Sequence, residues 1–362
     1  MKVLISGGGT GGHVFPAIAI ADAVRSINPE TEILFVGALG KLEMQKVPQA
    51  GYKIIGLPIR GFQRKLSLQN IKLIYSLVKS LWMSMEIIRT FKPDVVVGVG
   101  GYASGPILKM AAWKKIPILI QEQNSFPGVT NKLMAKAAKK ICVAFEGLEK
   151  YFEKSKIAIT GNPVRKDLIN DVDSSRARMH FGLDPNIKTV GIFGGSLGAR
   201  SINEAVLHIA DKMEDENIQW LWQTGSLYYE QLSKHSLAEK KNVKILPFID
   251  KMDFAYAASD IIVSRAGALT IAELCVKAKP SILIPSPNVA EDHQRKNAEA
   301  MLKKNAARMI LDANAKSDLW KQIIELLDSE ELKNEMKMAL KKLARPNAAL
   351  DIAKEVIELT KV

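Results

Sequence analysis

The chain of 362 residues is poor in metal-binding and disulfide-forming side chains, with only two cysteines, Cys142 and Cys275, and five histidines. Both cysteines sit in apolar runs and lack Cys-x-x-Cys spacing, which predicts buried thiols in a reducing compartment. No His or Cys pattern has the spacing of metal ligands, so we expect no metal and no cofactor to be held by the protein.

Long apolar runs are also missing. No uncharged stretch reaches the length of a membrane-spanning helix. The chain starts with a strand-like run that leads directly into a glycine-rich loop, so we expect no cleavable signal before it. An apolar content of 47% and a charged content of 25% are ordinary for a soluble globular protein. At this length, two domains are expected.

The positive charge is confined to the first half of the chain. Residues 1–160 contain 22 Lys and Arg and 10 Asp and Glu, a balance of +12, whereas residues 161–362 contain 29 and 28, a balance of +1. A basic half is attracted to nucleic acid or to an anionic membrane surface. No helix-turn-helix, RNA-binding or zinc pattern is present, so nucleic acid is not expected as a partner.

Apolar and aromatic side chains lie among these basic residues. In the helical stretch 71–83, Leu77, Leu81 and Trp82 accompany two lysines, and Trp113 and Lys140 add similar character elsewhere. Tryptophan beside lysine suits a bilayer interface, so we expect this patch to contact an anionic membrane surface. The alternative is a helix packed on its sheet, with its lysines simply solvated.

Alternating strands and helices predict an α/β fold with parallel sheets covered on both faces. Strands are expected at 3–5, 33–36, 53–57, 95–97, 116–120, 140–144 and 157–159, and then at 190–193, 220–223, 243–246, 261–263, 281–284 and 308–311, with the longest helix at 68–89. The pattern breaks at 161–165, and the polar stretch 166–178 is expected to be a linker. We therefore expect two doubly wound, Rossmann-like domains at 1–162 and 163–345 that face a cleft. A helix at 346–362 is expected to pack back on the first domain.

The first strand leads into Gly7-Gly8-Gly9-Thr10-Gly11-Gly12-His13, a loop with five glycines before a helix. Glycines let the backbone approach a ligand, and a helix N-terminus attracts anions. We interpret the loop as a phosphate or sugar site. The alternative is a tight turn without a ligand, which five glycines beside Thr and His fit poorly.

Polar or glycine-rich segments follow two further strands of the first half. Gly98-Val99-Gly100-Gly101-Tyr102-Ala103-Ser104 is a second glycine-rich turn, expected to belong to the same site or to be structural. Gln121-Glu122-Gln123-Asn124 places four polar side chains at an expected strand end. Amides and carboxylates suit sugar hydroxyls; the alternative is an exposed turn.

The second half repeats the strand, turn and helix design. Gly194-Gly195-Ser196-Leu197-Gly198 follows one strand, and Ser264-Arg265-Ala266-Gly267-Ala268-Leu269-Thr270 follows another. The amides of residues 268–270 are expected to face an anion. Glu273, one turn further on, suits a ribose diol, although a lone helical Glu is usually exposed. The long loop 285–294 ends in His293 and Gln294, which are candidates for sugar contacts.

His13 is the candidate general base, because an imidazole titrates near neutral pH. The alternative is a histidine that caps or orients the loop.

Seven motifs in this order resemble glycosyltransferase family 28, in the branch that acts in the second membrane step of bacterial peptidoglycan synthesis. They are Gly-Gly-Thr-Gly-Gly-His with Pro16, Gly-Gly-Tyr-x-Ser-Gly-Pro, Gln-Glu-Gln-Asn, Gly-Asn-Pro-Val-Arg, Gly-Gly-Ser-x-Gly-Ala-Arg, Ser-Arg-x-Gly-Ala-Leu-Thr-x-x-Glu and Asp-His-Gln. The resemblance spans nearly the whole chain. His293 is a departure, since some relatives have Gln there.

The resemblance implies a GT-B fold and an inverting transfer of N-acetylglucosamine from UDP-N-acetylglucosamine to the C4 hydroxyl of the muramoyl residue of lipid I, giving lipid II. It also implies a peripheral position on the cytoplasmic face of the bacterial cell membrane. Its implied site residues are His13 as candidate base; Thr10, Gly11, Gly12 and Asn124 at the sugar; Arg165 and Ser196 near the diphosphate; Ile249 at uracil; Ala268, Leu269 and Thr270 as amide donors; Glu273 at the ribose; Gln294 at sugar hydroxyls; and Gly9, Gly101, Tyr102 and Ser104 in the acceptor loops.

Three other functions fit parts of the sequence. One is a glycosyltransferase or epimerase that uses UDP-sugars on another substrate. A dinucleotide-dependent oxidoreductase is disfavoured because no acidic residue stands at 36–38, where the second strand ends. A non-enzymatic membrane-binding module would explain the basic half but not the loops of the second half.

Overall fold

A computed structural model describes residues 1–59, 69–215 and 217–361, with side chains of 69–73, 166 and 290 left aside. The chain forms two compact units, one of Met1–Val164 with Pro346–Val362 and one of Arg165–Arg345. We describe each unit by itself. Leu68, where the longest helix was expected to begin, lies outside the described residues.

Unit 1 is built on a seven-stranded sheet with the order β3-β2-β1-β4-β5-β6-β7, in which all described pairs are parallel. Its strands are β1 (Lys2–Gly7), β2 (Glu32–Ala38), β3 (Lys53–Leu57), β4 (Val95–Gly100), β5 (Ile118–Glu122), β6 (Lys140–Val143) and β7 (Ile157–Ile159). Its α-helices are α1 (Gly11–Ile27), α2 (Glu43–Gln49), α3 (Gln69–Phe91), α4 (Ser104–Trp113), α5 (Val129–Met134) and α14 (Ala348–Glu358).

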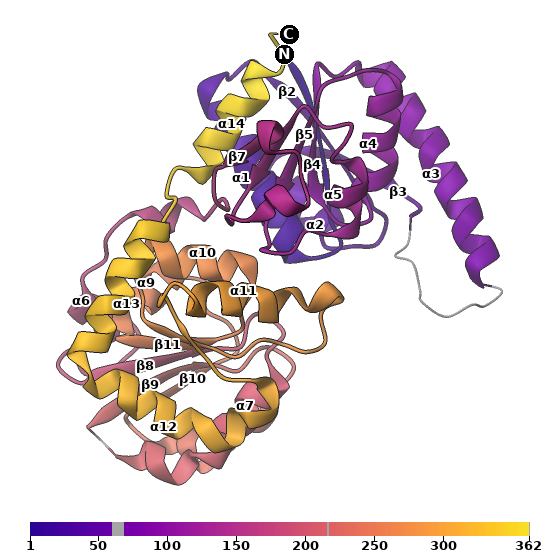
Figure 1. The fold of residues 1–362 in the computed structure, drawn as a ribbon. Coiled ribbons are helices and arrows are strands. Elements are labelled where there is room, and N and C mark those ends of the chain that lie inside the picture. The colour runs from indigo at the N-terminus through magenta and orange to yellow at the C-terminus, as the bar shows by residue number, and fades with distance from the viewer. Residues whose placement is uncertain (60–68, 216, 362) are drawn as a thin grey trace. The chain divides into compact units, whose positions relative to one another are not determined.

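Two apolar clusters cover the two faces of this sheet. Strand residues such as Val3 and Ile5 face one cluster and their neighbour Leu4 faces the other, as the period of two along a strand requires. Helix α14 completes the first cluster, since Ile352, Ala353 and Val356 are fully buried there. It packs along α1, and the two ends of the chain lie side by side (Figure 1).

Unit 2 contains a six-stranded sheet with the order β10-β9-β8-β11-β12-β13, again parallel. Its strands are β8 (Lys188–Phe193), β9 (Ile218–Gln223), β10 (Val243–Leu246), β11 (Ile261–Ser264), β12 (Ser281–Leu283) and β13 (Arg308–Met309). Its α-helices are α6 (Ser174–His180), α7 (Arg200–His208), α8 (Tyr229–Leu232), α9 (Met252–Ala258), α10 (Ala268–Val276), α11 (His293–Leu302), α12 (Ala315–Asp328) and α13 (Glu330–Leu343).

The expectation of a plain linker at 166–178 is wrong for its second part. Helix α6 begins at Ser174, and Asp173 caps it by accepting a hydrogen bond from the Arg176 amide. Arg178 anchors this helix to unit 2 by donating hydrogen bonds to the carbonyls of Ala258 and Pro185 and by pairing with Asp260 at 2.8 Å. The polar sequence therefore builds part of the second unit.

Candidate functional site

His13 lies in the first turn of α1, directly after the glycine-rich loop that follows β1. Its Nδ1 is 3.0 Å from Oε1 of Gln123, the residue after β5. Its ring packs against the turn after β4: a Cβ at Gly100 would lie 3.0 Å from Cε1, and one at Gly101 would lie 3.3 Å from Cδ2. The second glycine-rich turn therefore gives space to the imidazole.

The side chains of Gln121 and Gln123 turn inward, which corrects the expectation that they bind sugar hydroxyls. Strand β5 continues to Glu122 rather than ending at 120, and Gln121, Glu122 and Gln123 are all buried. Gln121 donates to Oδ1 of Asn162 (3.0 Å), and Asn162 donates to the Gln123 carbonyl (2.9 Å). Each buried amide thus has protein partners, which is what makes its burial tolerable.

Glu122 organises the loop that carries Asn124. Its carboxylate accepts hydrogen bonds from the amides of Asn124 and Gly128, both at 3.0 Å, and from Nδ2 of Asn131 at 2.8 Å. The Asn124 side chain is half-buried. The loop that carries Asn124 therefore begins where β5 ends, and β5 lies beside β4 in the sheet.

Glu43, a residue that the sequence did not single out, holds the opening loop. Its side chain is 1% exposed and accepts hydrogen bonds from the amides of Gly9 (3.0 Å) and Ala38 (2.9 Å). A Cβ at Gly8 would lie 2.1 Å from its Oε1. The amide of Gly9 is therefore already bonded to a carboxylate within unit 1.

Tyr102 and Ser104 complete the turn after β4. The Tyr102 ring lies against Gly9, whose Cβ would be 3.4 Å from Cε1, and burial raises the pKa of its phenol, with the Glu43 charge adding to the effect. Ser104 is fully buried and donates to the Gly101 carbonyl at 3.0 Å. Its hydroxyl therefore holds the turn, which corrects its expected place at the acceptor.

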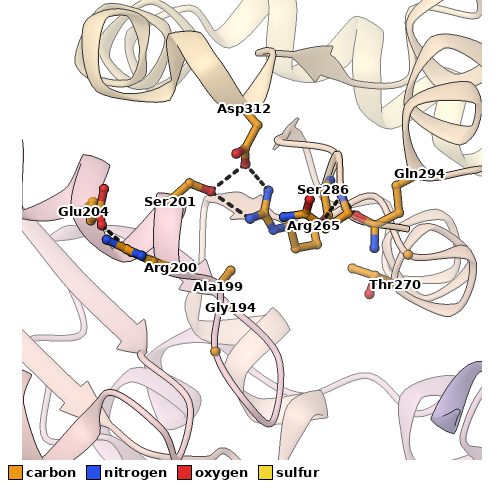
Figure 2. Close-up of a pocket in the computed structure, with 13 residues that line it drawn as sticks. Gly194, Ala199, Arg200, Ser201, Glu204, Arg265, Thr270, Ser286, Gln294 and Asp312 are labelled. Atoms are coloured by element: carbon orange, nitrogen blue, oxygen red, sulfur yellow. Dashed lines mark hydrogen bonds and ion pairs between the residues drawn. The ribbon is translucent and has the colours of Figure 1, made fainter. Parts of the chain in front are cut away.

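Unit 2 contains a pocket of about 590 Å³ at the carboxyl ends of its strands (Figure 2). Two of the expected ligand contacts, Thr270 and Gln294, line it. Among the described residues, those that line the pocket are Gly194, Gly198, Ala199, Arg200, Ser201, Glu204, Arg265, Gly267, Thr270, Ser286, Asn288, Gln294 and Asp312. This placement agrees with the rule that ligands of open α/β sheets bind outside the carboxyl ends of the strands.

A polar triad forms one wall of this pocket (Figure 2). The Arg265 guanidinium donates to Asp312 Oδ1 (2.5 Å) and to Ser201 Oγ (2.7 Å), and also to the carbonyl of Ile284 (3.0 Å). Asp312 therefore neutralises Arg265. Arg265 belongs to a motif that was recognised, but its partners are 64 and 47 residues away, so no local signal could have revealed the triad.

The first turn of α10 and the side chain of Gln294 supply hydrogen-bond donors. Gly267 caps α10 in an extended conformation, so the amides of residues 268–270 lie in the first turn of the helix, at its positive end. Gln294 uses its Oε1 to accept from the Ser286 amide at 2.9 Å, which leaves its NH2 as the group it can offer to a ligand.

Glu273, Tyr256 and Arg165 meet on unit 2. Glu273 Oε2 accepts a hydrogen bond from the Tyr256 hydroxyl (2.8 Å), and its Oε1 lies 3.8 Å from Arg165 Nε. The Glu273 side chain is only 15% exposed, so the alternative of an exposed helical carboxylate is wrong. Burial raises the pKa of the Glu273 carboxyl, and the guanidinium opposes the rise.

The other residues of unit 2 that the sequence singled out as ligand contacts follow β8, β10 and β12. Ser196 is exposed on the loop before α7, and its carbonyl accepts from the Ser226 amide at 3.0 Å. The side chain of Ile249 is buried, so only its backbone can face a ligand. His293 is the first residue of α11, directly after two residues with positive φ, Glu291 and Asp292.

The expected membrane patch is exposed on α3 and α4. Leu77 is 41%, Trp82 69% and Trp113 68% exposed, whereas Leu81 is half-buried. The expectation that Lys140 belongs to this patch is wrong, because Lys140 forms an ion pair with Glu355 of α14 at 3.1 Å within unit 1. Within the described ranges, no helix is both long and apolar enough to span a membrane.

The chain matches two known domains along its length. Residues 3–143 match the Glycosyltransferase family 28 N-terminal domain, and residues 189–356 match the Glycosyltransferase family 28 C-terminal domain. These ranges agree with the family resemblance seen in the seven motifs.

Curated relatives are similar over nearly full length. A protein of Phocaeicola vulgatus is 52% identical, covering 99% of this chain and 96% of its own, and one of Parabacteroides distasonis is 51% identical, covering 99% and 98%. Both are named UDP-N-acetylglucosamine–N-acetylmuramyl-(pentapeptide) pyrophosphoryl-undecaprenol N-acetylglucosamine transferase.

Solved structures confirm the expected GT-B fold. MurG of Acinetobacter baumannii superposes with a TM-score of 0.80 at 26% identity, covering 99% of both chains. The glycosyltransferase SnogD of Streptomyces nogalater superposes with a TM-score of 0.68 at 15% identity, which is a likeness of fold alone. From the two domain matches and the curated relatives, we conclude that the chain belongs to glycosyltransferase family 28.

Proposed function

We propose that the protein transfers N-acetylglucosamine from UDP-N-acetylglucosamine to the C4 hydroxyl of the N-acetylmuramyl residue of lipid I, forming lipid II with inversion. The observation that carries this proposal is the 52% identity, over 99% of the chain, to a relative whose name states this donor and this class of acceptor. The alternative of an epimerase or of a transferase for another acceptor is less consistent with that identity.

In this proposal, unit 2 supplies the residues that bind the UDP-sugar. Glu273, held by the Tyr256 hydroxyl, accepts hydrogen bonds from the ribose diol, and the Ile249 backbone contacts uracil. Arg165 and Ser196 lie near the diphosphate, and the amides of residues 268–270 face phosphate and sugar. The positive end of α10 and the guanidinium stabilise the negative charge of the departing UDP.

Unit 1 supplies the base. His13 Nε2 takes the proton of the C4 hydroxyl while the hydroxyl oxygen forms a bond to C1 of N-acetylglucosamine. The bond from C1 to the diphosphate oxygen breaks, and its electron pair leaves with UDP. Thr10, Gly11, Gly12 and Asn124 contact the sugar. Gly101, beside the imidazole, and Tyr102, beside Gly9, shape the acceptor side.

Transfer of radiolabelled N-acetylglucosamine from the UDP-sugar to a lipid I analogue tests the reaction. We expect product with and without EDTA, because cationic side chains and helix N-termini stabilise the leaving group in this proposal. His13→Ala is expected to lower kcat by about 10²- to 10⁴-fold, whereas His208→Ala, at an exposed histidine of α7, leaves it unchanged. Absence of transfer to the lipid would refute the reaction, and a near-normal kcat of His13→Ala would refute the base.

We further propose that unit 1 binds the cytoplasmic face of the bacterial cell membrane peripherally. Ile74, Tyr75, Val78 and Trp82 on α3 are each at least 60% exposed, while Ser80 on the opposite face is fully buried. The apolar stripe of α3 therefore points outward, against the alternative of a helix that packs it on the sheet. Unit 1 contains 24 Lys and Arg and 13 Asp and Glu, a balance of +11, which suits an anionic leaflet.

Sedimentation with vesicles that contain phosphatidylglycerol tests this membrane proposal. Ile74→Glu with Trp82→Glu is expected to weaken binding at least tenfold, because it replaces apolar contacts by charges that the lipid repels. Met338→Glu on α13 is the control, since Met338 is 59% exposed in the nearly neutral unit 2. Equal binding of the double variant and wild type would contradict a role for α3.

A further inference from the structure

Three buried side-chain amides form a chain of hydrogen bonds that ends at the imidazole of His13. His13 Nδ1 contacts Gln123 Oε1 at 3.0 Å, and Gln123 Nε2 contacts Oε1 of Gln121. Gln121 Nε2 contacts Oδ1 of Asn162 at 3.0 Å. Gln121, Gln123 and Asn162 are 0%, 1% and 3% exposed, so protein contacts decide which way each amide points.

Backbone carbonyls fix the orientation of this row at both ends. Asn162 Nδ2 lies 2.9 Å from the Gln123 carbonyl, and Gln123 Nε2 lies 2.7 Å from the Val99 carbonyl. A carbonyl only accepts, so both of these side-chain nitrogens must be the NH2 groups. The oxygen of Gln123 is therefore the atom that faces His13, and an amide oxygen only accepts.

We infer that Gln123 is a positioning residue that holds neutral His13 in the tautomer with the proton on Nδ1. The inference rests on the proposed function of His13 as base, because in this tautomer Nε2 is the ring nitrogen that can accept a proton. Gly100 and Gly101 lie beside the ring, where a Cβ would approach Cε1 to 3.0 Å and Cδ2 to 3.3 Å, so the ring has its place only because both residues lack a side chain. A side chain that fixes tautomer and ring orientation acts through the histidine, as acids do beside histidines in other sites.

The tautomer can be measured on the protein without substrate. Nitrogen-15 NMR of protein labelled at histidine, at pH 8.5, distinguishes protonated Nδ1 from protonated Nε2, and His13→Ala identifies the His13 signals. We expect protonated Nδ1 in the wild type. In Gln123→Met, which removes the acceptor, we expect a shift toward protonated Nε2. Gln219→Met is the matched control, because Gln219 is also buried (2% exposed) and bonds the carbonyls of Asp184 and Ile187 in unit 2.

Gln123→Glu tests the same inference by rescue. A glutamic acid at this position can donate its O–H to the Val99 carbonyl while its other oxygen accepts from Nδ1–H, and an ionised glutamate can also accept from Nδ1–H of the neutral imidazole. Both arrangements keep the proton on Nδ1 and leave Nε2 as the acceptor. We expect Gln123→Met to lower kcat by about 10- to 100-fold with little change in the KM for the UDP-sugar, and Gln123→Glu to recover most of the loss.

Different results overturn the inference and the proposed function. Protonated Nε2 in the wild type, or an unchanged Nδ1–H signal in Gln123→Met, overturns the positioning role of Gln123 whatever His13 does. Full activity of His13→Ala overturns the base but leaves the tautomer measurement valid. If Gln123→Met does not fold, the wild-type spectrum and the spectrum of Gln123→Glu still decide, since protonated Nε2 in either one overturns the inference.

Discussion

Replacing Gly101 by alanine should destabilise unit 1, and the size of the effect follows from a comparison with the same substitution at Gly51. Gly101 has a φ of +79°, and a Cβ there would lie 2.4 Å from the Gly8 carbonyl oxygen. Gly51, after α2, has a φ of +82°, and no atom of the residues that the structure describes lies within 4 Å of its Cβ position. Both variants incur the strain of a left-handed alanine, about 1–2 kcal/mol. Only Gly101→Ala also forces backbone apart.

The extra cost of Gly101→Ala comes from the opening loop. The Gly8 carbonyl must retreat by at least 0.6 Å to reach the 3.0 Å limit (3.0 minus 2.4), and overpacking of this kind costs roughly 1–3 kcal/mol. For a unit of this size, each kcal/mol lowers Tm by roughly 2–4 °C. Gly101→Ala should therefore melt roughly 2–12 °C below Gly51→Ala.

Activity should separate the two variants further. Gly8 precedes His13 in the same loop, and the new methyl group would also lie 3.3 Å from His13 Cδ2. We expect kcat of Gly101→Ala to fall at least tenfold while Gly51→Ala keeps wild-type kcat. Thermal unfolding followed by circular dichroism and the transfer assay measure both effects. Equal Tm and equal kcat for the two variants would refute the close approach of these loops.

Two further predictions concern unit 2. Glu273→Gln should weaken UDP binding about 10- to 100-fold in calorimetry but change the binding of 2′-deoxy-UDP much less. The reason is that the 2′-hydroxyl loses a hydrogen bond to a charged acceptor, and 2′-deoxy-UDP has no such hydroxyl. Equal losses for both ligands would count against ribose recognition. Burial lowers the pKa of Lys279 to about 8, so burying the charged ammonium destabilises the folded state most below pH 8. The free energy of unfolding should therefore rise by roughly 2–4 kcal/mol from pH 8 to 10.5. Urea denaturation at several pH values measures this rise, which should be absent in Lys279→Met.

The fold could be predicted because its signals are local. Near-continuous apolar strands such as β1 and β4 are buried on both faces, and this requires a parallel sheet with helices on either side. Glycine-rich turns at strand ends marked where His13 and residues 268–270 would lie. The boundary error at β5 has a physical cause: Gln121 and Glu122 look like loop residues, but buried partners allow them to continue the strand.

The interior polar contacts could not be predicted, because they join distant parts of the chain. Gln123 reaches His13 across 110 residues, and Arg265 reaches Ser201 across 64. Glu43 shows the same limit: no acidic residue stands at 36–38, yet a carboxylate from α2 reaches the end of β2 and the glycine-rich loop. One signal was present for Gln123, since it belongs to a polar run, residues 121–124, that follows an apolar strand, and polar side chains that are buried there must find partners.

The return of α14 to unit 1 has a consequence for how the protein is made. Helix α1 and strands β1–β7 leave the ribosome first, but the apolar surface that Ile352, Ala353 and Val356 bury stays uncovered until the 181 residues of Arg165–Arg345 have followed. At roughly 5–20 residues per second, synthesis of that segment takes about 10–40 s. During this interval the nascent first unit exposes an apolar surface beside α1. A chaperone would shield this surface, and two nascent chains could associate through it.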